Sequence, residues 1–347
     1  MTVHPARVFT VEFTHKNQPR TLRAGELFAA PRDAGFRDTP ANELRDLIAE
    51  VEGGRPWREV VAARFAATKP WLHSIIADPR RTAFFDPLLP AGTDPVLDIG
   101  AGWGQIARPV AARRPVVALE PVAERLGFVQ AAGRQDGVAG NMAFVAADYF
   151  DTAFTTRFAA ICAIGVLEWA GAFQNQMDPQ ERQRAFLRKA RSELAPGGTL
   201  VLGIENRLGL KYLLGCPDDH IGVPHIAWLP AALARRRWQE SSGHTLQSFT
   251  YSLSELTALL HAADFGSVEF FGAFPDYKLP SKIISLADGG AALCRWLLNE
   301  LPPPEHNGYN GETLDATQQE TLAAAYRSLA ADGIAHHFAP SFFVRAT

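Results

Sequence analysis

The chain has 347 residues, which allows about two domains of ordinary size or one core with large additions. Its 34 lysines and arginines nearly balance its 37 aspartates and glutamates, so the formal net charge is −3. This balance argues against a general nucleic-acid binder, which needs a basic surface to displace counterions from phosphates. The apolar and charged shares, 47% and 20%, are ordinary for a globular protein and exclude the disordered, collagen-like and coiled-coil classes.

The cysteines and the apolar runs indicate a cellular compartment. Cys162, Cys216 and Cys294 are far apart and odd in number, which fits neither a disulfide framework nor a zinc ribbon and favours a reducing compartment. No apolar run reaches the roughly 18 residues of a membrane span, and residues 1–5 lack the apolar region of a signal peptide. The sequence therefore predicts a cytoplasmic protein.

The first 89 residues have a pattern of their own. An alternating segment at 8–13 precedes a stretch interrupted by glycine and proline, and apolar residues at helical spacing follow at 44–51 and 57–65. We predict a small α+β or helical cap over residues 1–89.

From Pro95 onward, short apolar runs alternate with helical stretches, which is the pattern of βαβ units and a parallel sheet. Buried parallel strands read as continuous apolar runs, and five such runs occur in chain order. They are residues 96–99, 116–119, 143–145, 160–164 and 199–204.

The second half contains two long excursions, at about 208–250 and 278–340. A helix restarts at Ser252, which forms a capping box with Glu255, and a strand follows near 268–271. The apolar, β-prone end at 341–344 predicts that the excursions are inserted into a doubly wound α/β core that runs from 90 to 347.

The most informative stretch is residues 98–105, which joins an apolar strand to a helix through Gly100, Gly102 and Gly104. Such a turn lets the backbone approach a ligand and aims the amides of a helix N-terminus at it. On its own, the loop could equally be a tight turn that binds nothing.

Two acidic residues at strand ends favour a ligand. Glu120 ends the second apolar run, where a carboxylate can accept hydrogen bonds from both ribose hydroxyls. Asp148 follows the third run and could accept hydrogen bonds from an adenine amino group. Because open α/β sheets bind ligands at the carboxyl ends of their strands, the sequence predicts an adenosine-containing ligand.

Together, the glycine loop, Glu120, Asp148 and the runs 164–169 and 194–198 resemble the class I S-adenosylmethionine-dependent methyltransferases. The motifs span about residues 95–206 in the order and spacing of that family. The resemblance implies a seven-stranded Rossmann-like sheet with an antiparallel last strand, S-adenosylmethionine as the cofactor, and methyl transfer as the activity.

In that family the glycine loop holds the methionine and ribose end of the cofactor, and the two acidic residues meet the ribose and the adenine. The resemblance implies the following cofactor-binding residues: Asp98, Gly100, Ala101, Gly102, Gly104, Glu120, Pro121, Asp148, Tyr149 and Gly165. A nicotinamide dehydrogenase is the competing interpretation, but its G-x-G-x-x-G fingerprint is not met, because Ile106 and Ala107 stand where the last glycine would fall.

Methyl transfer from a sulfonium depends largely on positioning, and a hydroxyl acceptor additionally needs a base or a metal. His220 is the preferred general base, oriented by Asp218 and Asp219; the alternative is an ordinary loop histidine. Glu205 is the second catalytic candidate and could instead bind substrate hydroxyls or cap a helix.

The substrate-binding candidates are Glu168, Asn206, Asp219, Asp276, Tyr277 and Lys278. Asp276 and Lys278 could instead form a surface ion pair. No metal site is predicted. His336 and His337 are adjacent, and in an extended segment their side chains would point in opposite directions and could not bind one ion together.

The polar stretches at 205–220 and 274–280 also resemble a bacterial subgroup of these methyltransferases associated with surface-polysaccharide and other glycan gene clusters. We therefore expect a small-molecule or glycan acceptor, with O-methylation of a sugar favoured and no nucleic-acid partner. The alternatives are N- or O-methylation of a natural-product scaffold, and a non-catalytic scaffold protein with this fold.

Overall fold

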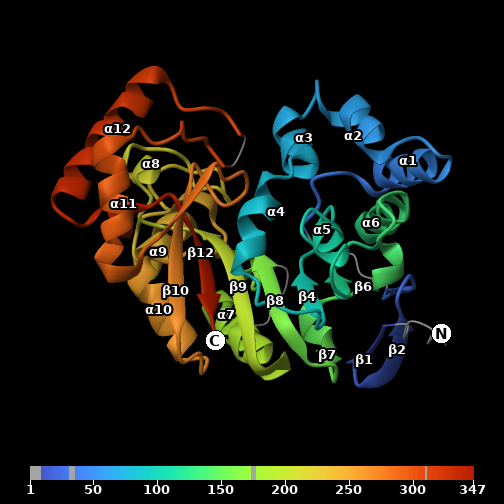
Figure 1. The fold of residues 1–347 in the computed structure, drawn as a ribbon. Helices are drawn as coiled ribbons and strands as arrows, with labels where there is room; N and C mark the ends of the chain where they lie inside the picture. The colour runs from blue at the N-terminus through green and yellow to red at the C-terminus, as the bar shows by residue number, and fades with distance from the viewer. Residues whose placement is uncertain (1–8, 31–35, 173–176, 309–310) are drawn as a thin grey trace. The chain divides into compact units, whose positions relative to one another are not determined.

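The computed structural model describes residues 9–30, 36–172, 177–308 and 311–347 (Figure 1). The chain divides into two compact units. Unit 1 comprises Met1–Thr82, Leu89–Cys162 and Glu193–Gly198, and unit 2 comprises Ala83–Leu88, Ala163–Ser192 and Thr199–Thr347. Residues 1–5 and Val8, which entered the signal-peptide and alternation predictions, lie outside the described residues.

The parallel strands of unit 1 lie where the apolar runs predicted them. Strands β4 (Val96–Ile99), β5 (Val116–Leu119) and β6 (Met142–Ala146) pair in parallel, and every residue in them is buried. Helix α5 (Ala107–Ala111) follows β4, and α6 (Ala123–Gln135) follows β5, which gives the expected βαβ order (Figure 1). Burial on both faces explains why these strands read as unbroken apolar runs.

The leader contributes two sets of strands to unit 1. Strands β1 (Thr10–His15) and β2 (Gln18–Arg23) pair antiparallel, and β7 (Thr152–Phe154) joins β1 as a third strand. Strand β3 (Leu27–Ala29) instead pairs in parallel with β6. The leader therefore shares a sheet with the residues that follow it.

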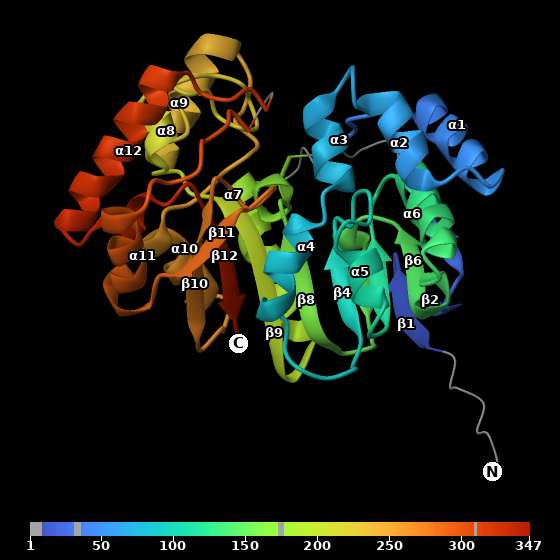
Figure 2. The same cartoon turned by 45° about the horizontal axis from the view of Figure 1, so that its top comes forward.

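The helices of the leader are α1 (Ala41–Glu52), α2 (Trp57–Phe65), α3 (Pro70–Ala77) and α4 (Arg80–Phe85). Helix α1 lies beside α6 in both views (Figure 2). Trp103 of the glycine loop packs edge-on against Phe65 and Phe128, with ring centroids 5.7 and 5.0 Å away. This apolar cluster fixes one side of the loop.

The antiparallel part of the large sheet lies in unit 2. Strand β12 (Ser341–Ala346) pairs antiparallel with β9 (Leu194–Glu205) and with β10 (Val268–Phe274), and β11 (Lys282–Ser285) pairs with β10 (Figure 1). The C-terminal strand is thus antiparallel, as the family resemblance implied, and it lies between two earlier strands. Strand β9 begins at Leu194, earlier than the predicted start at residue 199.

The strand order of the sheet is β11-β10-β12-β9-β8-β4-β5-β6-β3, where β8 is Phe158–Ile164. The doubly wound α/β class is confirmed. In the described residues the sheet has nine strands where seven were expected, because β3 and β11 extend its two edges.

The predicted excursions contain helices. The first holds α8 (Leu210–Leu213) and α9 (Ala231–Ser242), and the second holds α11 (Ala287–Asn299) and α12 (Ala316–Ala331), which lie side by side (Figure 2). Helix α7 is Pro179–Glu193, and α10, Leu253–His261, begins with the predicted Ser252–Glu255 capping box. The short 3-10 helices are η1 (Asp86–Leu88), η2 (Ala139–Asn141), η3 (Tyr149–Asp151), η4 (Leu167–Trp169) and η5 (Ala335–Phe338). Among the described residues, no helix has both the length and the apolar character that crossing a bilayer requires.

Candidate active site

The glycine loop after β4 has the backbone that its sequence predicts. Gly100, Gly102 and Gly104 have φ values of +67°, +54° and +77°, in the left-handed region that disfavours other residues. A Cβ on Gly104 would lie 2.7 Å from Cγ1 of Val129. The amide of Ala101 donates to the carbonyl of Leu119 at 3.0 Å, so the loop is tied to the end of β5.

Glu120 lies directly against this loop. One of its oxygens accepts a hydrogen bond from the amide of Gly102 at 3.1 Å, and the other accepts from Val122 at 3.1 Å and from Arg125 at 3.2 Å. The carboxylate is 3% exposed, yet it is held by backbone amides and a guanidinium, which is how a buried charge is tolerated. Glu120 therefore lies where the sequence predicted it, at the end of β5 and beside the glycine loop.

Asp38 of the leader also reaches this region, and the sequence analysis missed it. Its Oδ2 accepts a hydrogen bond from the indole of Trp103 at 3.0 Å, and its Oδ1 lies 3.3 Å from the Arg125 guanidinium. Asp38 therefore joins the glycine loop to the arginine that holds Glu120. No local pattern could have found it, because 65 positions separate Asp38 from Trp103.

Asp98 begins the loop and is 3% exposed. Burial raises the pKa of its carboxyl to about 7, although a hydrogen bond from the Ala107 amide and the charge of Arg81 act in the opposite direction. Its Oδ2 has no hydrogen-bond partner among the described residues. Asp98 is therefore a carboxyl group whose protonation changes near neutral pH.

The other predicted cofactor residues of unit 1 lie at the ends of their strands. Asp148 follows β6 and accepts a hydrogen bond from the Phe150 amide at 2.7 Å, so it also caps the short helix η3. The hydroxyl of Tyr149 donates to the buried carboxylate of Glu193 at 2.7 Å. Pro121 is half-buried and stands in the loop between β5 and α6.

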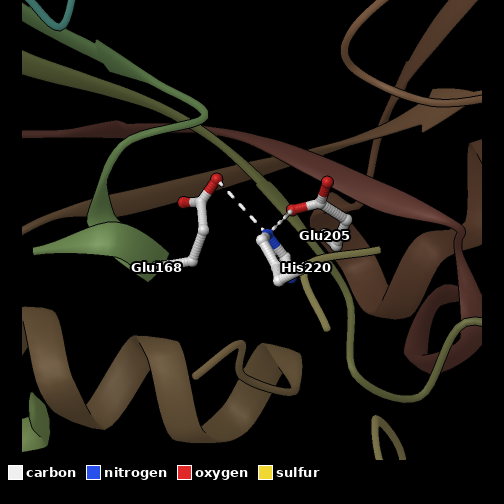
Figure 3. A group of neighbouring side chains, drawn as sticks. All are labelled: Glu168, Glu205 and His220. Atoms are coloured by element: carbon white, nitrogen blue, oxygen red, sulfur yellow. Dashed lines mark ion pairs between the residues drawn. The ribbon is translucent and has the colours of Figure 1, made fainter. Parts of the chain in front are cut away.

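A second polar cluster lies within unit 2, and Figure 3 shows its three side chains converging. Glu168 follows the end of β8, Glu205 is the last residue of β9, and His220 lies in the loop after α8. Nε2 of His220 is 3.8 Å from Oε1 of Glu168 and 3.6 Å from Oε2 of Glu205, and the three side chains are 6%, 0% and 1% exposed. The second oxygen of Glu168 and the Oε2 of Glu205 have no hydrogen-bond partner in the described part of the chain.

The histidine of this cluster is held on two sides. Its Nδ1 lies 3.4 Å from Oδ1 of Asp218, and its ring packs edge-on against Trp169 with centroids 5.0 Å apart. Burial disfavours the imidazolium, but the carboxylates of Glu205, Asp218 and Glu168 outweigh it and raise the pKa of His220 well above its usual value. Burial also raises the pKa of Glu168.

Asp219 does not orient His220, contrary to our expectation. Its carboxylate instead lies 3.0 and 3.1 Å from Nζ of Lys211 and 3.3 Å from Nζ of Lys278. Although burial acts in the opposite direction, the charges of Lys211 and Lys278 hold the pKa of Asp219 below its usual range. Lys211 could not be identified from the sequence, because a single lysine in the run Leu210–Leu213 carries no sign of burial.

Lys278 connects this ion pair to the second polar cluster. It forms a short ion pair with Oε1 of Glu205 and lies 3.7 Å from Asp276. Asp276 is 4% exposed, so the pair is not the surface ion pair that was the alternative. The predicted residues Glu205, Asp219, Asp276 and Lys278 are therefore in one buried network.

Three other predicted residues have specific partners. The Asn206 amide donates to the carbonyls of His337 and Ala339 at 2.8 Å, and its oxygen accepts from the Leu208 amide at 3.0 Å. Its side-chain amide thus holds the surrounding backbone and is not part of the proposed acceptor site. Gly165 has a φ of +72°, and a Cβ there would lie 2.8 Å from the hydroxyl of Tyr277.

The hydroxyl of Tyr277 is in turn 3.5 Å from Oε1 of Glu168.

The prediction for His336 and His337 was wrong in its geometry. They lie in the 3-10 helix η5, not in an extended segment, and their rings are 4.0 Å apart.

Residues 96–198 match a family model described as a methyltransferase domain. The matched segment contains the glycine loop, Glu120, Asp148 and Glu168, and extends from β4 into β9. By this match and the fold, residues 96–198 form a methyltransferase domain of the class I, S-adenosylmethionine-dependent type. The chain is a methyltransferase that uses S-adenosylmethionine.

Solved structures with similar folds include three methyltransferases. The S-adenosylmethionine-dependent methyltransferase from Thermotoga maritima is 16% identical, with 83% of this chain and 97% of that chain covered and a TM-score of 0.40. The CcbJ methyltransferase from Streptomyces caelestis is 20% identical, with 70% and 93% covered and a TM-score of 0.42. The N-methyltransferase NodS from Bradyrhizobium japonicum is 17% identical, with 63% and 85% covered and a TM-score of 0.34.

No curated protein sequence matches the chain significantly. None of these comparisons supports the finer resemblance to the glycan-associated subgroup.

Proposed function

We propose that the enzyme methylates a hydroxyl group of a small polar acceptor, with a sugar favoured, and that Glu168, Glu205 and His220 contact the reacting hydroxyl. One observation carries this proposal. Two fully buried carboxylates at the carboxyl ends of β8 and β9 converge with an imidazole, and each carboxylate has an oxygen without a hydrogen-bond partner in the described chain. Buried polar groups are normally paired, so unpaired ones suit a ligand that supplies the missing partner.

The proposed reaction is an in-line displacement. The acceptor oxygen forms a bond to the methyl carbon while the bond from that carbon to sulfur breaks, and its electron pair stays on sulfur to give S-adenosylhomocysteine. Glu205 and His220 are the proposed catalytic residues: the proton of the hydroxyl passes to Glu205, and His220, whose pKa is raised, stabilises the negative charge that develops on the hydroxyl oxygen. Glu205 offers the unpaired oxygen Oε2, and His220 lies beside it.

Charge favours oxygen over nitrogen as the methylated atom. An amine placed beside Glu168 and Glu205 would be held as ammonium, because nearby carboxylates stabilise a positive charge. Ammonium has no lone pair and cannot attack the methyl group. A neutral hydroxyl has no such difficulty, and it can donate to one carboxylate oxygen before it reacts.

The other predicted site residues have two proposed roles, cofactor binding and acceptor binding. We propose that the residues of the glycine loop, with Glu120 and Asp148, bind the cofactor, and that the insertions at about 208–250 and 278–340 supply acceptor-binding side chains. These side chains include Asp219 and Lys278, and Asp276 and Tyr277 lie beside the second insertion. The net charge of −3 supports a non-nucleic-acid acceptor.

The test has two steps, of which the first is calorimetric titration of the purified protein with S-adenosylmethionine, S-adenosylhomocysteine and NAD. We expect micromolar binding of the first two and none of NAD; absence of cofactor binding would favour the scaffold alternative. The second step is release of S-adenosylhomocysteine with a panel of sugars, sugar nucleotides, phenols and amines.

A matched pair of variants ties the reaction to the site. We expect Glu205→Gln to lower kcat at least a hundredfold with any hydroxyl substrate, because it removes a proton acceptor. Glu269→Gln, which changes an exposed residue of β10, should leave kcat unchanged. Turnover confined to amines, or equal activity in both variants, would overturn the proposal.

A further inference from the structure

We propose that Glu168, Glu205 and His220 form a binding site for one divalent cation of the first transition row, such as Mn²⁺ or Zn²⁺. This inference deepens the proposed function and rests on it for the role of the cation, because it assigns the ion to the same cluster. The donor set is two carboxylates and one imidazole, and their ligand atoms all lie within 4.8 Å of one another. Carboxylate oxygens suit Mn²⁺, and imidazole nitrogen suits Zn²⁺.

The distances in the cluster fit a bridging cation better than direct hydrogen bonds. A hydrogen bond from a ring N–H to a carboxylate is normally about 2.7–3.2 Å long. Nε2 of His220 is 3.6 Å from Glu205 and 3.8 Å from Glu168, which is too far for either bond. Two atoms that each bind a cation at about 2.1 Å are about 3.4 Å apart at the tetrahedral angle and farther at wider angles.

Burial and charge give a second argument. Glu168 and Glu205 are 0% and 1% exposed, and an oxygen of each lacks a hydrogen-bond partner in the described residues. A buried carboxylate that is not fully paired is costly. Asp218 adds a third negative charge beside the ring, so a divalent cation would offset charge that Lys278 balances only in part.

The groups behind the three ligands also fit a metal site. Histidines that bind metals usually present their other ring nitrogen to a carboxylate, which fixes the tautomer and the ring plane. Nδ1 of His220 faces Asp218 at 3.4 Å, Oε1 of Glu205 is held by Lys278, and the hydroxyl of Tyr277 reaches Oε1 of Glu168. Each ligand is thus oriented through an atom or group outside the cluster.

Three protein ligands leave at least one coordination position open. A hydroxyl oxygen bound there would be polarised, and its pKa would fall because the cation would stabilise the alkoxide. With Glu205 and His220 bound to the cation, the hydroxyl proton would pass to Oε2 of Glu168, which has no hydrogen-bond partner in the described residues. The acceptors that this site would favour are therefore those that present a hydroxyl with a second oxygen close by, such as a vicinal diol. The cation would select such acceptors over isolated alcohols.

The binding test uses the full-length protein after treatment with EDTA and dialysis, with Mn²⁺ alone as the probe. We expect electron paramagnetic resonance to show one Mn²⁺ bound per chain with micromolar affinity. Glu168→Gln and His220→Gln should each weaken binding at least tenfold. His337→Gln is the matched control, because it changes a histidine pair in η5 that could otherwise hold an ion.

A measurement on the wild-type protein keeps the test decisive if a buried variant does not fold. X-ray absorption of the protein loaded with one equivalent of Zn²⁺ should show one imidazole nitrogen and carboxylate oxygens. Two imidazole ligands would place the ion at His336 and His337 and overturn the proposal. So would the absence of Mn²⁺ and Zn²⁺ binding at millimolar concentration, or binding that survives in folded Glu168→Gln and His220→Gln.

The two proposals fail in different ways. Cation binding at the cluster without turnover of any hydroxyl acceptor would keep the metal site and reject the acceptor class. Turnover of a sugar by EDTA-treated protein that binds no cation would keep the acceptor class and reject the metal site.

Discussion

Lys211 and Asp219 form an ion pair in the interior of unit 2, with Nζ 3.0 Å from Oδ1 and side chains only 2% and 1% exposed. The pair joins α8 to the loop that carries His220, the next residue after Asp219. A second ammonium group, that of Lys278, lies 3.3 Å from the same carboxylate. The Asp219 carboxylate therefore lies between two positive charges that only the folded chain brings together.

Removing one charge from this network should strongly destabilise the protein. Asp219→Asn leaves two buried ammonium groups without their shared carboxylate, and breaking a buried ion pair in this way typically costs about 3–5 kcal/mol. Urea unfolding followed by circular dichroism measures the loss. Glu240→Gln is the control, because its pair with Arg236 is about 70% exposed on both sides and should contribute less than about 1 kcal/mol. Equal losses in the two variants would contradict the assigned burial.

Asp98 should make stability fall as pH rises from about 4 to 7. Its pKa is about 7 in the folded protein and about 3.9 when unfolded, so over this range the folded state alone keeps the proton. Stability then decreases by at most about 1.4 kcal/mol per pH unit from this group. Urea unfolding of the wild type and Asp98→Asn at pH 5, 6 and 7 checks this.

The difference between those two proteins is the informative quantity, because Glu305, whose pKa burial also raises to about 7, contributes the same trend to both. We expect the wild type to lose stability relative to Asp98→Asn as pH rises. A constant difference across this range would show that Asp98 is already ionised in the folded protein.

We expect cofactor binding to require glycine at position 104, both because the backbone lies close to α6 there and because its φ is positive. Gly104→Ala combines a φ of +77° with a Cβ 2.7 Å from Val129, whereas Gly137→Ala has a φ of +73° and no atom within 4 Å of its Cβ. We expect a strain of about 1–2 kcal/mol in both variants. Only Gly104→Ala should weaken S-adenosylhomocysteine binding, by about tenfold or more, in calorimetric titration. Similar affinities for the two variants would show that the glycine loop does not bind the cofactor.

Glu120→Gln should lower cofactor affinity without unfolding the loop. The amide keeps the size of the side chain but loses the charge that faces Arg125 and the Gly102 amide, and a neutral group is a weaker acceptor for ribose hydroxyls. Calorimetric titration should give a Kd for S-adenosylhomocysteine about 10–100 times higher. Glu124→Gln, in the first turn of α6, should leave the Kd unchanged. An unchanged Kd in Glu120→Gln would remove Glu120 from the cofactor site.

Much of the fold follows from local pattern. The buried strands β4, β5, β6 and β8 lie at their apolar runs, and the Ser252–Glu255 capping box begins α10. Strand β3 was not identified, because three residues with exposed or half-buried side chains carry no strand period. Its pairing with β6 depends on a backbone partner more than a hundred positions away.

The glycine loop and the acidic strand ends could be recognised because each is a short motif whose chemistry is local. The partners of Asp38, Lys211 and Lys278 could not, because each is an ion pair or hydrogen bond between separate elements. A charged residue has the same appearance in the sequence whether it lies in solvent or in the interior. Asp276 and Lys278 illustrate this: a surface pair was the alternative for them in the sequence, but Asp276 is 4% exposed and the side chain of Lys278 only 14%.

The sequence by itself determined the α/β class, the glycine loop, the cofactor and the positions of Glu168 and Glu205 at or just after strand ends. Tertiary structure decided which of these side chains meet. It brings Asp218 against His220, and it pairs Asp219 with Lys211 and Lys278. The physical reason is that apolar periodicity records burial along one element. The energy of a buried charge depends on partners that distant segments supply, and only folding fixes their distances.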